Sequence, residues 1–130
     1  SFYNPVGKLN QHPAYTDLLS GDAHLADVLE RLRRSPQWSK MVVILTYDEN
    51  GGFWDHVPPP TGPGWGDRWG PGTRVPAIIV SPFAKRGYVD KTPYDTTSVL
   101  KFITRRFGLE PLPGVRANAG DLTGAFDFAQ

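Results

Sequence analysis

The sequence predicts an α/β fold in which only part of the sheet is present. Two short apolar runs, 41–47 and 75–80, indicate strands, and two amphipathic stretches, 22–34 and 96–107, indicate helices. The order helix, strand, loop, strand, helix is that of half an α/β sandwich. Two strands cannot form a self-sufficient parallel sheet with both faces covered, so we expect the missing strands to come from a longer parent chain or another subunit.

Length and composition bound the class of protein. With 130 residues the chain is one domain at most. Its net charge of +1 does not indicate the excess of positive charge that is typical of nucleic-acid-binding proteins. No apolar run approaches the roughly 20 residues of a transmembrane segment. The absence of cysteine excludes disulfides, thiolate metal sites and cysteine nucleophiles. The chain begins at Ser1 without an initiator Met or a signal-peptide pattern, and we expect it to be an excised piece of something longer.

The first helix is predicted over about 22–34, after an irregular lead-in over residues 1–19. Ser20 or Asp22 can cap its N-terminus. Ser35-Pro36 ends it, because proline and the residue before it disfavour a helical backbone. The apolar residues at i, i+3, i+4 and i+7 are Leu25, Val28, Leu29 and Leu32.

The run 41–47 carries no charge and is rich in β-branched residues, which predicts a strand buried on both faces. The loop that follows, 50–74, is unusually long, and such loops are more often functional or disordered. Its aromatic residues favour a packed loop that either walls a substrate cleft or seals itself; they include Trp54, Trp65 and Trp69. The second strand, 75–80, has Pro76 near its first position, where a missing N–H is tolerated.

The second helix is predicted over about 96–107, with Asp95 as its N-cap and Gly108 as its C-terminal stop. Its predicted apolar face consists of Val99, Leu100, Ile103 and Phe107. The tail, 109–130, is punctuated by proline and glycine and is predicted to be irregular, with a short helical turn near 121–126.

The adjacent carboxylates Asp48 and Glu49 are the first candidate functional residues. They follow an apolar strand, and ligands of open α/β sheets bind at the carboxyl ends of strands. Adjacent carboxylates repel, so a divalent cation is a natural partner. Asn50-Gly51-Gly52 gives the chain the freedom to turn both side chains towards one ion. The alternative is that one carboxylate caps a turn and the other pairs with an arginine.

Three further residues are candidates on weaker grounds. His12 precedes a proline in a loop, where it is either an ordinary surface histidine or a substrate-contacting group. Asp55 and His56 follow the diglycine, and they either orient metal ligands from a second shell or pin the loop against the strand as a hydrogen-bonded pair.

Five stretches together resemble the bacterial phosphoesterase family of acid phosphatases and phospholipases C, within the alkaline phosphatase superfamily. They occur in the family's order, and the Asp-Glu-Asn-Gly-Gly block is the most specific of them. The stretches are Gln11-His12-Pro13, Ser20-Gly21-Asp22, Thr46-Tyr47-Asp48-Glu49-Asn50-Gly51-Gly52-Phe53-Trp54-Asp55-His56-Val57-Pro58-Pro59, Arg74-Val75-Pro76-Ala77-Ile78-Ile79-Val80-Ser81-Pro82-Phe83 and Tyr94-Asp95-Thr96-Thr97-Ser98-Val99-Leu100.

The resemblance implies a partial, alkaline-phosphatase-like three-layer sandwich. Residues 1–130 would be the C-terminal segment of a phosphoesterase catalytic domain, with a lead-in over 1–19 that holds the His-Pro motif, an α/β core over 20–108 and an irregular tail over 109–130. Family members also carry an upstream Glu-Asn metal motif and a Ser or Thr nucleophile, and neither has a counterpart here.

The resemblance also implies roles for individual residues. Asp48 and Glu49 would bind one divalent metal ion of unknown identity, and His12 would face the phosphate of the substrate. The intact protein would hydrolyse a phosphate monoester or the phosphodiester of a phospholipid head group, in the periplasm or outside the cell. A sulfatase or phosphonate hydrolase of the same superfamily fits the sequence block less well.

A hypothesis of another class remains open. The chain can instead be a catalytically inactive structural fragment, which pairs with a missing N-terminal half or self-associates through exposed sheet edges.

Overall fold

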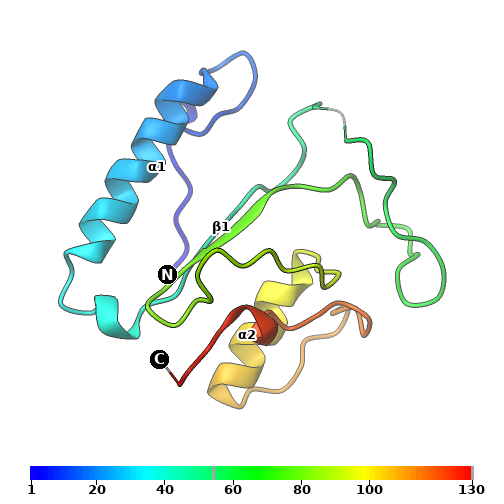
Figure 1. Ribbon diagram of the computed structural model, residues 1–130. Helices are drawn as coiled ribbons and strands as arrows, with labels where there is room; N and C mark the ends of the chain where they lie inside the picture. The colour runs from blue at the N-terminus through cyan, green and yellow to red at the C-terminus, as the bar shows by residue number, and fades with distance from the viewer. Residues whose placement is uncertain (54, 130) are drawn as a thin grey trace. The chain divides into compact units, whose positions relative to one another are not determined.

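The computed structural model describes residues 1–53 and 55–129, so the predicted wall residue Trp54 lies outside the described part (Figure 1). The chain divides into two compact units, Ser1–Met41 and Val42–Gln130.

The first unit is built on α1 (Leu18–Arg33), with one short 3-10 turn before it and one after it, η1 (Gly7–Leu9) and η2 (Trp38–Lys40). The helix begins four residues earlier than predicted, and neither Ser20 nor Asp22 is its cap. Asp17 is the N-cap, because its carboxylate accepts the backbone N–H of Ser20 at 2.6 Å. The predicted stop is confirmed, since the helix ends just before Ser35-Pro36.

The second unit contains the two predicted strands, β1 (Val43–Thr46) and β2 (Ala77–Val80). They pair antiparallel, with Val43 opposite Val80 and Thr46 opposite Ala77. The long connection therefore closes a hairpin, and the parallel arrangement expected from the apolar runs is wrong for this pair. Antiparallel neighbours need no crossover helix, and the described residues between the strands, 47–53 and 55–76, contain none.

The expectation that the strand at 41–47 is buried on both faces is also wrong. β1 is only half-buried, and in β2 the side chain of Ile78 is 58% exposed. The reason lies in the packing, because the core cluster takes only one residue from each strand, Ile44 of β1 and Ile79 of β2, together with Val42 just before β1. The described chain thus forms part of an α/β fold, with a single two-stranded sheet.

The second helix, α2, spans Thr97–Phe107 and ends at Gly108, as predicted. Gly108 has φ 62° and ψ 37°, the left-handed conformation that favours glycine at a helix C-terminus. The N-cap position is Thr96, but the capping side chain is the predicted Asp95. Its carboxylate accepts the backbone N–H of Thr97 at 2.8 Å.

The predicted apolar face of α2 is only partly correct. Val99 packs on the core together with Phe102, which the prediction omitted. Leu100, Ile103 and Phe107 are instead exposed, Phe107 by 65%. Helical periodicity identifies a stripe of apolar residues, but the neighbouring segments decide which side of the stripe is covered.

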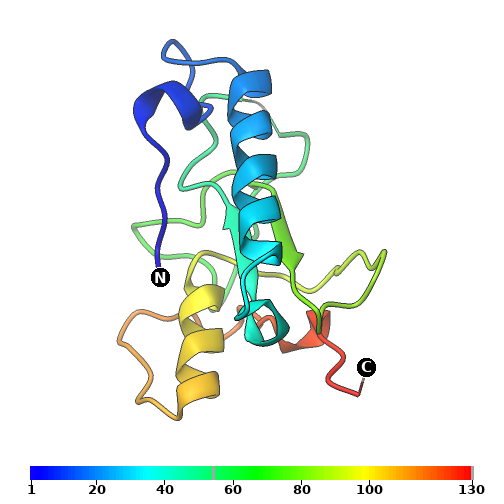
Figure 2. The ribbon, with the colours of Figure 1, turned by 90° about the vertical axis from the view of Figure 1, so that its left-hand side faces the viewer.

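The fully buried apolar residues of the second unit come from the tail, which returns alongside α2 (Figure 2). A 3-10 turn, η3 (Thr123–Ala125), stands where a helical turn is predicted. The ring of Phe126 stacks on that of Phe102 with centroids 5.2 Å apart. An irregular tail therefore supplies the centre of the core; its buried apolar members are Ala119, Leu122, Ala125 and Phe126.

Within residues 1–53 and 55–129, no helix is long and apolar enough to cross a membrane.

Candidate functional site

The carboxylates of Asp48 and Glu49 stand exposed just beyond the end of β1. Asp48 Oδ1 accepts the backbone N–H of Glu49 at 3.1 Å, and Glu49 Oε2 accepts that of Gly51 at 2.7 Å. Both side chains therefore cap the turn at the strand end. An ionised carboxylate offers about four lone-pair sites, so one backbone bond leaves it able to accept a cation as well.

The predicted turn after these carboxylates is present. Gly51 and Gly52 have φ of 62° and 80°, which only glycine adopts readily. The side chain of Asn50 accepts the N–H of Gly52 at 3.1 Å, and its backbone carbonyl accepts that of Phe53 at 3.0 Å. Backbone bonds and the diglycine thus fix the direction in which the chain leaves the strand.

Asp55 does not bond His56 but forms a bidentate ion pair with Arg74, which precedes β2. Arg74 Nε donates to Oδ2 at 2.9 Å and Nη2 donates to Oδ1 at 3.0 Å. The backbone N–H of Val57, followed by the guanidinium, holds the pKa of Asp55 below its usual range. Asp55 therefore joins the two ends of the loop through an arginine, whereas a hydrogen-bonded pair with His56 was the expected alternative, and a role of either residue in a second shell stays a prediction. His56 lies exposed beside it.

His12 lies in the first unit, and its imidazole is exposed. Its ring stacks on that of Tyr15 with centroids 4.4 Å apart, and Nδ1 lies 2.6 Å from the carbonyl oxygen of Pro13. If Nδ1 carries the proton and donates to this carbonyl, Nε2 is left as an acceptor. The ring is oriented by local contacts of its own loop.

Among the described residues, no group of three or more histidine, aspartate or glutamate side chains is placed to hold a metal ion. Asp48 and Glu49 are hard oxygen donors of the kind that Mg²⁺, Ca²⁺ and Mn²⁺ prefer, but such ions take six or more ligands. The pair fits part of a coordination shell, and further ligands would be needed to complete it.

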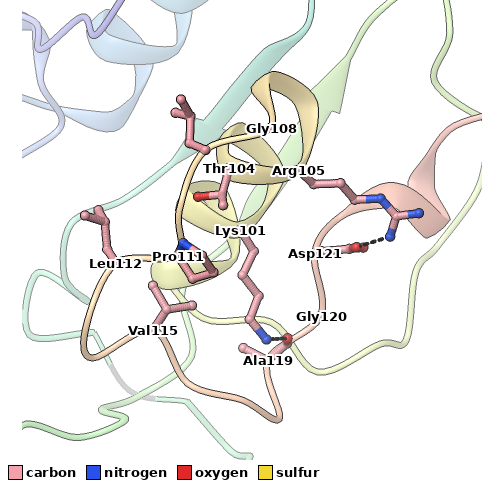
Figure 3. A pocket seen from close by; sticks show the side chains of 11 residues that line it. Lys101, Thr104, Arg105, Gly108, Pro111, Leu112, Val115, Ala119, Gly120 and Asp121 are labelled. Carbon is pink, nitrogen blue, oxygen red and sulfur yellow. Dashed lines mark hydrogen bonds and ion pairs between the residues drawn. The ribbon is translucent and has the colours of Figure 1, made fainter.

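A cavity of about 670 Å³ lies elsewhere in the second unit, between α2 and the tail. Figure 3 shows that two basic side chains of its lining have partners within the protein. Lys101 donates a hydrogen bond to the carbonyl of Ala119, and Arg105 forms an ion pair with Asp121. Its walls include Pro111, Leu112 and Val115, and none of the predicted site residues lines it.

The structure also reveals a charged cluster that the sequence analysis did not single out. The guanidinium of Arg116, in the tail, bonds Asp95 at the start of α2 and Asp67 in the long loop. No local pattern marks Arg116, because its partners lie 21 and 49 positions away along the chain.

A carboxylate pair at a strand end, beside a turn fixed by glycines, places hard oxygen donors where enzymes with open α/β sheets bind their ligands. Comparison with known proteins identifies the family. A sequence profile of the phosphoesterase family matches residues 1–110. The chain belongs to the phosphoesterase family.

The similar proteins include phospholipases C from bacteria and a plant. Non-hemolytic phospholipase C of Pseudomonas aeruginosa is 35% identical over 153 aligned residues, which cover 94% of this chain and 22% of that protein. Phospholipase C B of Mycobacterium tuberculosis is 37% identical over 154 residues, covering 99% and 29%. Non-specific phospholipase C6 of Arabidopsis thaliana is 36% identical over 122 residues, covering 77% and 23%. The chain thus spans about a quarter of the length of these relatives.

Proposed function

We propose that this chain is part of a metal-dependent phosphoesterase, in which Asp48 and Glu49 supply metal ligands and His12 contacts the phosphate. The observation that carries the proposal is the exposed carboxylate pair at the end of β1, in a chain of the phosphoesterase family. The nucleophile, a serine or threonine in the proposal, belongs to a part of the catalytic domain outside these residues.

The carboxylates contribute negative charge and hard oxygens at a fixed place. A divalent cation bound there would polarise the phosphoryl group and lower the pKa of a coordinated hydroxyl. Asp48 and Glu49 are suited to hold such an ion because backbone bonds already orient both side chains. Asp55 and His56 are proposed to act from a second shell, with Asp55 fixing the loop through Arg74.

His12 is proposed to stabilise a phosphoryl oxygen or to protonate the leaving group. A histidine whose Nδ1–H donates to a carbonyl presents Nε2 to its surroundings, and once protonated Nε2 can donate a proton. The Tyr15 ring stacked on the imidazole restricts its rotation. The histidine would thus act as an oriented acid at a defined atom.

The substrate class follows from the family and from the names of the relatives. We propose a phosphate ester, either a monoester or the phosphodiester of a phospholipid head group, and a periplasmic or secreted location for the intact protein. The three relatives described above are named phospholipases C, which favours the phospholipid.

Metal binding can be tested on this chain alone. Isothermal titration with Mn²⁺ should give a site that the double variant Asp48→Asn, Glu49→Gln loses, because its ligands become neutral amides. Glu110→Gln removes an exposed carboxylate from the tail and serves as the matched control. Equal Mn²⁺ affinity in the double variant and in the unchanged chain would remove the assignment of these ligands.

Catalysis is tested in the full-length protein. The double variant Asp48→Ala, Glu49→Ala should lose phosphate-ester hydrolysis by about a thousandfold or more, because several kcal/mol of transition-state stabilisation depends on the cation. Turnover close to that of the unchanged protein would contradict the proposed function.

A second candidate is that the chain is an inactive structural fragment that pairs with a missing N-terminal half or with another copy. It is favoured by the two-stranded sheet, in which β1 and β2 each have their only described strand partner on one side. Size-exclusion chromatography and an assay with p-nitrophenyl phosphate separate the candidates. A monomer that turns over this substrate unaided would rule out the second.

A further inference from the structure

Arg116 links two segments that are distant in the sequence. Its Nη1 donates to Asp95 Oδ2 at 2.8 Å, and its Nη2 donates to Asp67 Oδ2 at 3.0 Å and to Oδ1 at 3.2 Å. The Arg116 side chain is only 14% exposed and that of Asp95 only 8%. A planar guanidinium can serve two carboxylates at once, which the single ammonium of lysine does poorly.

The charges of this cluster are stabilised in place. Burial alone would raise the pKa of Asp95, but hydrogen bonds from Thr97 and Arg116 outweigh it and lower the pKa. The hydrogen bond to Asp95 is the largest of the causes that raise the pKa of Arg116. Among the described residues, Arg116 Nε is buried without a hydrogen-bond partner, so the guanidinium is held through its two terminal nitrogens.

A second contact joins the same stretch of tail to the same loop. Asn118 Nδ2 donates to the carbonyl of Pro63 at 2.8 Å. The loop backbone approaches so closely that a Cβ at Gly64, where φ is +85°, would lie 2.2 Å from that nitrogen. A side chain at residue 64 would therefore displace the Asn118 amide and would strain the backbone at its positive φ.

Asp67 in turn shapes the tip of the loop. Its Oδ1 accepts the backbone N–H of Trp69 at 2.7 Å, and its backbone pairs with that of Gly70 in both directions. The turn presents Trp69, which is 77% exposed, with the guanidinium of Arg68 4.1 Å from its ring centroid. Holding Asp67 therefore holds the turn that displays these two side chains.

We propose that Arg116 and Asn118 brace the tip of the loop 47–76 against the tail and the start of α2, and that Arg116 is a positioning residue for the candidate site at the start of this loop. The ion pair of Asp55 with Arg74 fixes the loop near its base, and the tail fixes it near its tip. Arg116 and Asn118 themselves lie beyond residues 1–110, the part matched by the family profile, whereas their partners lie within it. The positioning role rests on the proposed function, whereas the brace itself does not.

Hydrogen exchange on this chain tests the brace. In Arg116→Gln, amides of residues 61–72 should exchange at least about tenfold faster while those of β1 and β2 keep their rates, because loop opening no longer breaks an ion pair. Arg106→Gln, which alters an exposed arginine of α2, is the matched control. Asp67→Asn provides a second test if Arg116→Gln fails to fold, since it keeps the acceptor for Trp69 but loses the charge. If either variant, Arg116→Gln or Asp67→Asn, folds and its amides at residues 61–72 exchange at the rates of the unchanged chain, the brace is overturned.

Kinetics of the full-length protein test the positioning role. Arg116→Gln should lower kcat for a phosphate ester at least about tenfold with a smaller change in KM, and Arg116→Lys should restore part of it. Faster exchange with unchanged kcat would overturn the positioning role and leave the brace. A wild-type protein without phosphate-ester hydrolysis would overturn the proposed function and the positioning role together, and the exchange result would still decide the brace.

Discussion

Asp55 and Arg74 close the base of the long loop with two parallel hydrogen bonds of 2.9 and 3.0 Å. The carboxylate follows the diglycine after β1, and the guanidinium precedes β2. Paired charges at these two places hold the outgoing and returning chains together just beyond the strands. The segment that carries Asp48 and Glu49 therefore lies between two fixed points, the end of β1 before it and the clamp after it.

Replacing Arg74 by lysine should weaken this clamp. A lysine ammonium cannot make both hydrogen bonds at once, so the pKa of Asp55 should rise towards its usual value of 3.8. A carboxyl titration followed by NMR measures the change directly. Arg86→Lys, an exposed arginine outside the loop, should leave the titration of Asp55 where it was. An unaltered pKa in Arg74→Lys would mean that the clamp contributes nothing in solution.

The N-terminus of α1 should depend on Asp17 and not on Asp22. Asp17→Ala removes the acceptor of the Ser20 N–H, so helicity measured by circular dichroism should fall and the Ser20 amide should exchange faster. Asp17→Asn should keep most of the helix, because asparagine is an equally good cap. Asp22→Ala is the control, and a loss of helicity as large as that of Asp17→Ala would contradict the observed cap.

The C-terminus of α2 should be sensitive to any side chain at Gly108. Gly108→Ala forces a left-handed conformation on a residue with a Cβ and should lower the free energy of unfolding by about 1 kcal/mol. The space around Gly108 is open, so the effect isolates the backbone. Gly72→Ala is the control. The space around Gly72 is as open as that around Gly108, but the φ of Gly72 lies outside the left-handed region. Urea denaturation of both variants measures the difference, and equal stability would refute the strain.

Tyr94 should make the protein sensitive to alkaline pH. Burial, reinforced by a 2.6 Å hydrogen bond to Asp90, raises the pKa of Tyr94 from 10.0 to about 12. The protonated ring therefore stabilises the folded state fully below pH 10, and this contribution is lost as the pH rises towards 12. Ultraviolet titration of tyrosinate should show a late ionisation step near pH 12, and Tyr94→Phe should abolish it. A Tyr94→Phe titration that keeps the late step would reject the assignment.

Local signals in the sequence located the secondary structure of the second unit well. Gly108 ends α2 because the left-handed position after a helix favours glycine, and Pro76 marks the start of β2 because proline cannot donate within a ladder. These features depend on the chain within a few residues of the element. The cap of α1 was misplaced because Asp17, Ser20 and Asp22 are all suitable caps, and only the structure selects one.

Features that depend on distant partners could not be predicted. The apolar run of β1 is compatible with a parallel or an antiparallel neighbour, and only the return of the chain at β2 decides. Phe126 and Leu122 form the core from a tail without regular periodicity. The pairing of Arg116 with Asp67 spans 49 positions and follows no local pattern. At the candidate site, the sequence indicated Asp48 and Glu49 as ligands, and their role remains a prediction.

The hairpin closed by β1 and β2 has a consequence for how this family can diversify. The ends of the loop 47–76 are held one strand spacing apart whatever its length, and each doubling of a flexible loop costs only about 0.6 kcal/mol in closure entropy. The alignments with the Pseudomonas and Mycobacterium relatives run over 153 and 154 residues, against 130 in this chain, so those relatives contain stretches that have no counterpart here. A loop anchored in this way can lengthen or shorten while its first residues, Asp48 and Glu49, stay fixed to the end of a strand. The length of this loop can thus change in evolution without any change in the strands that hold its ends.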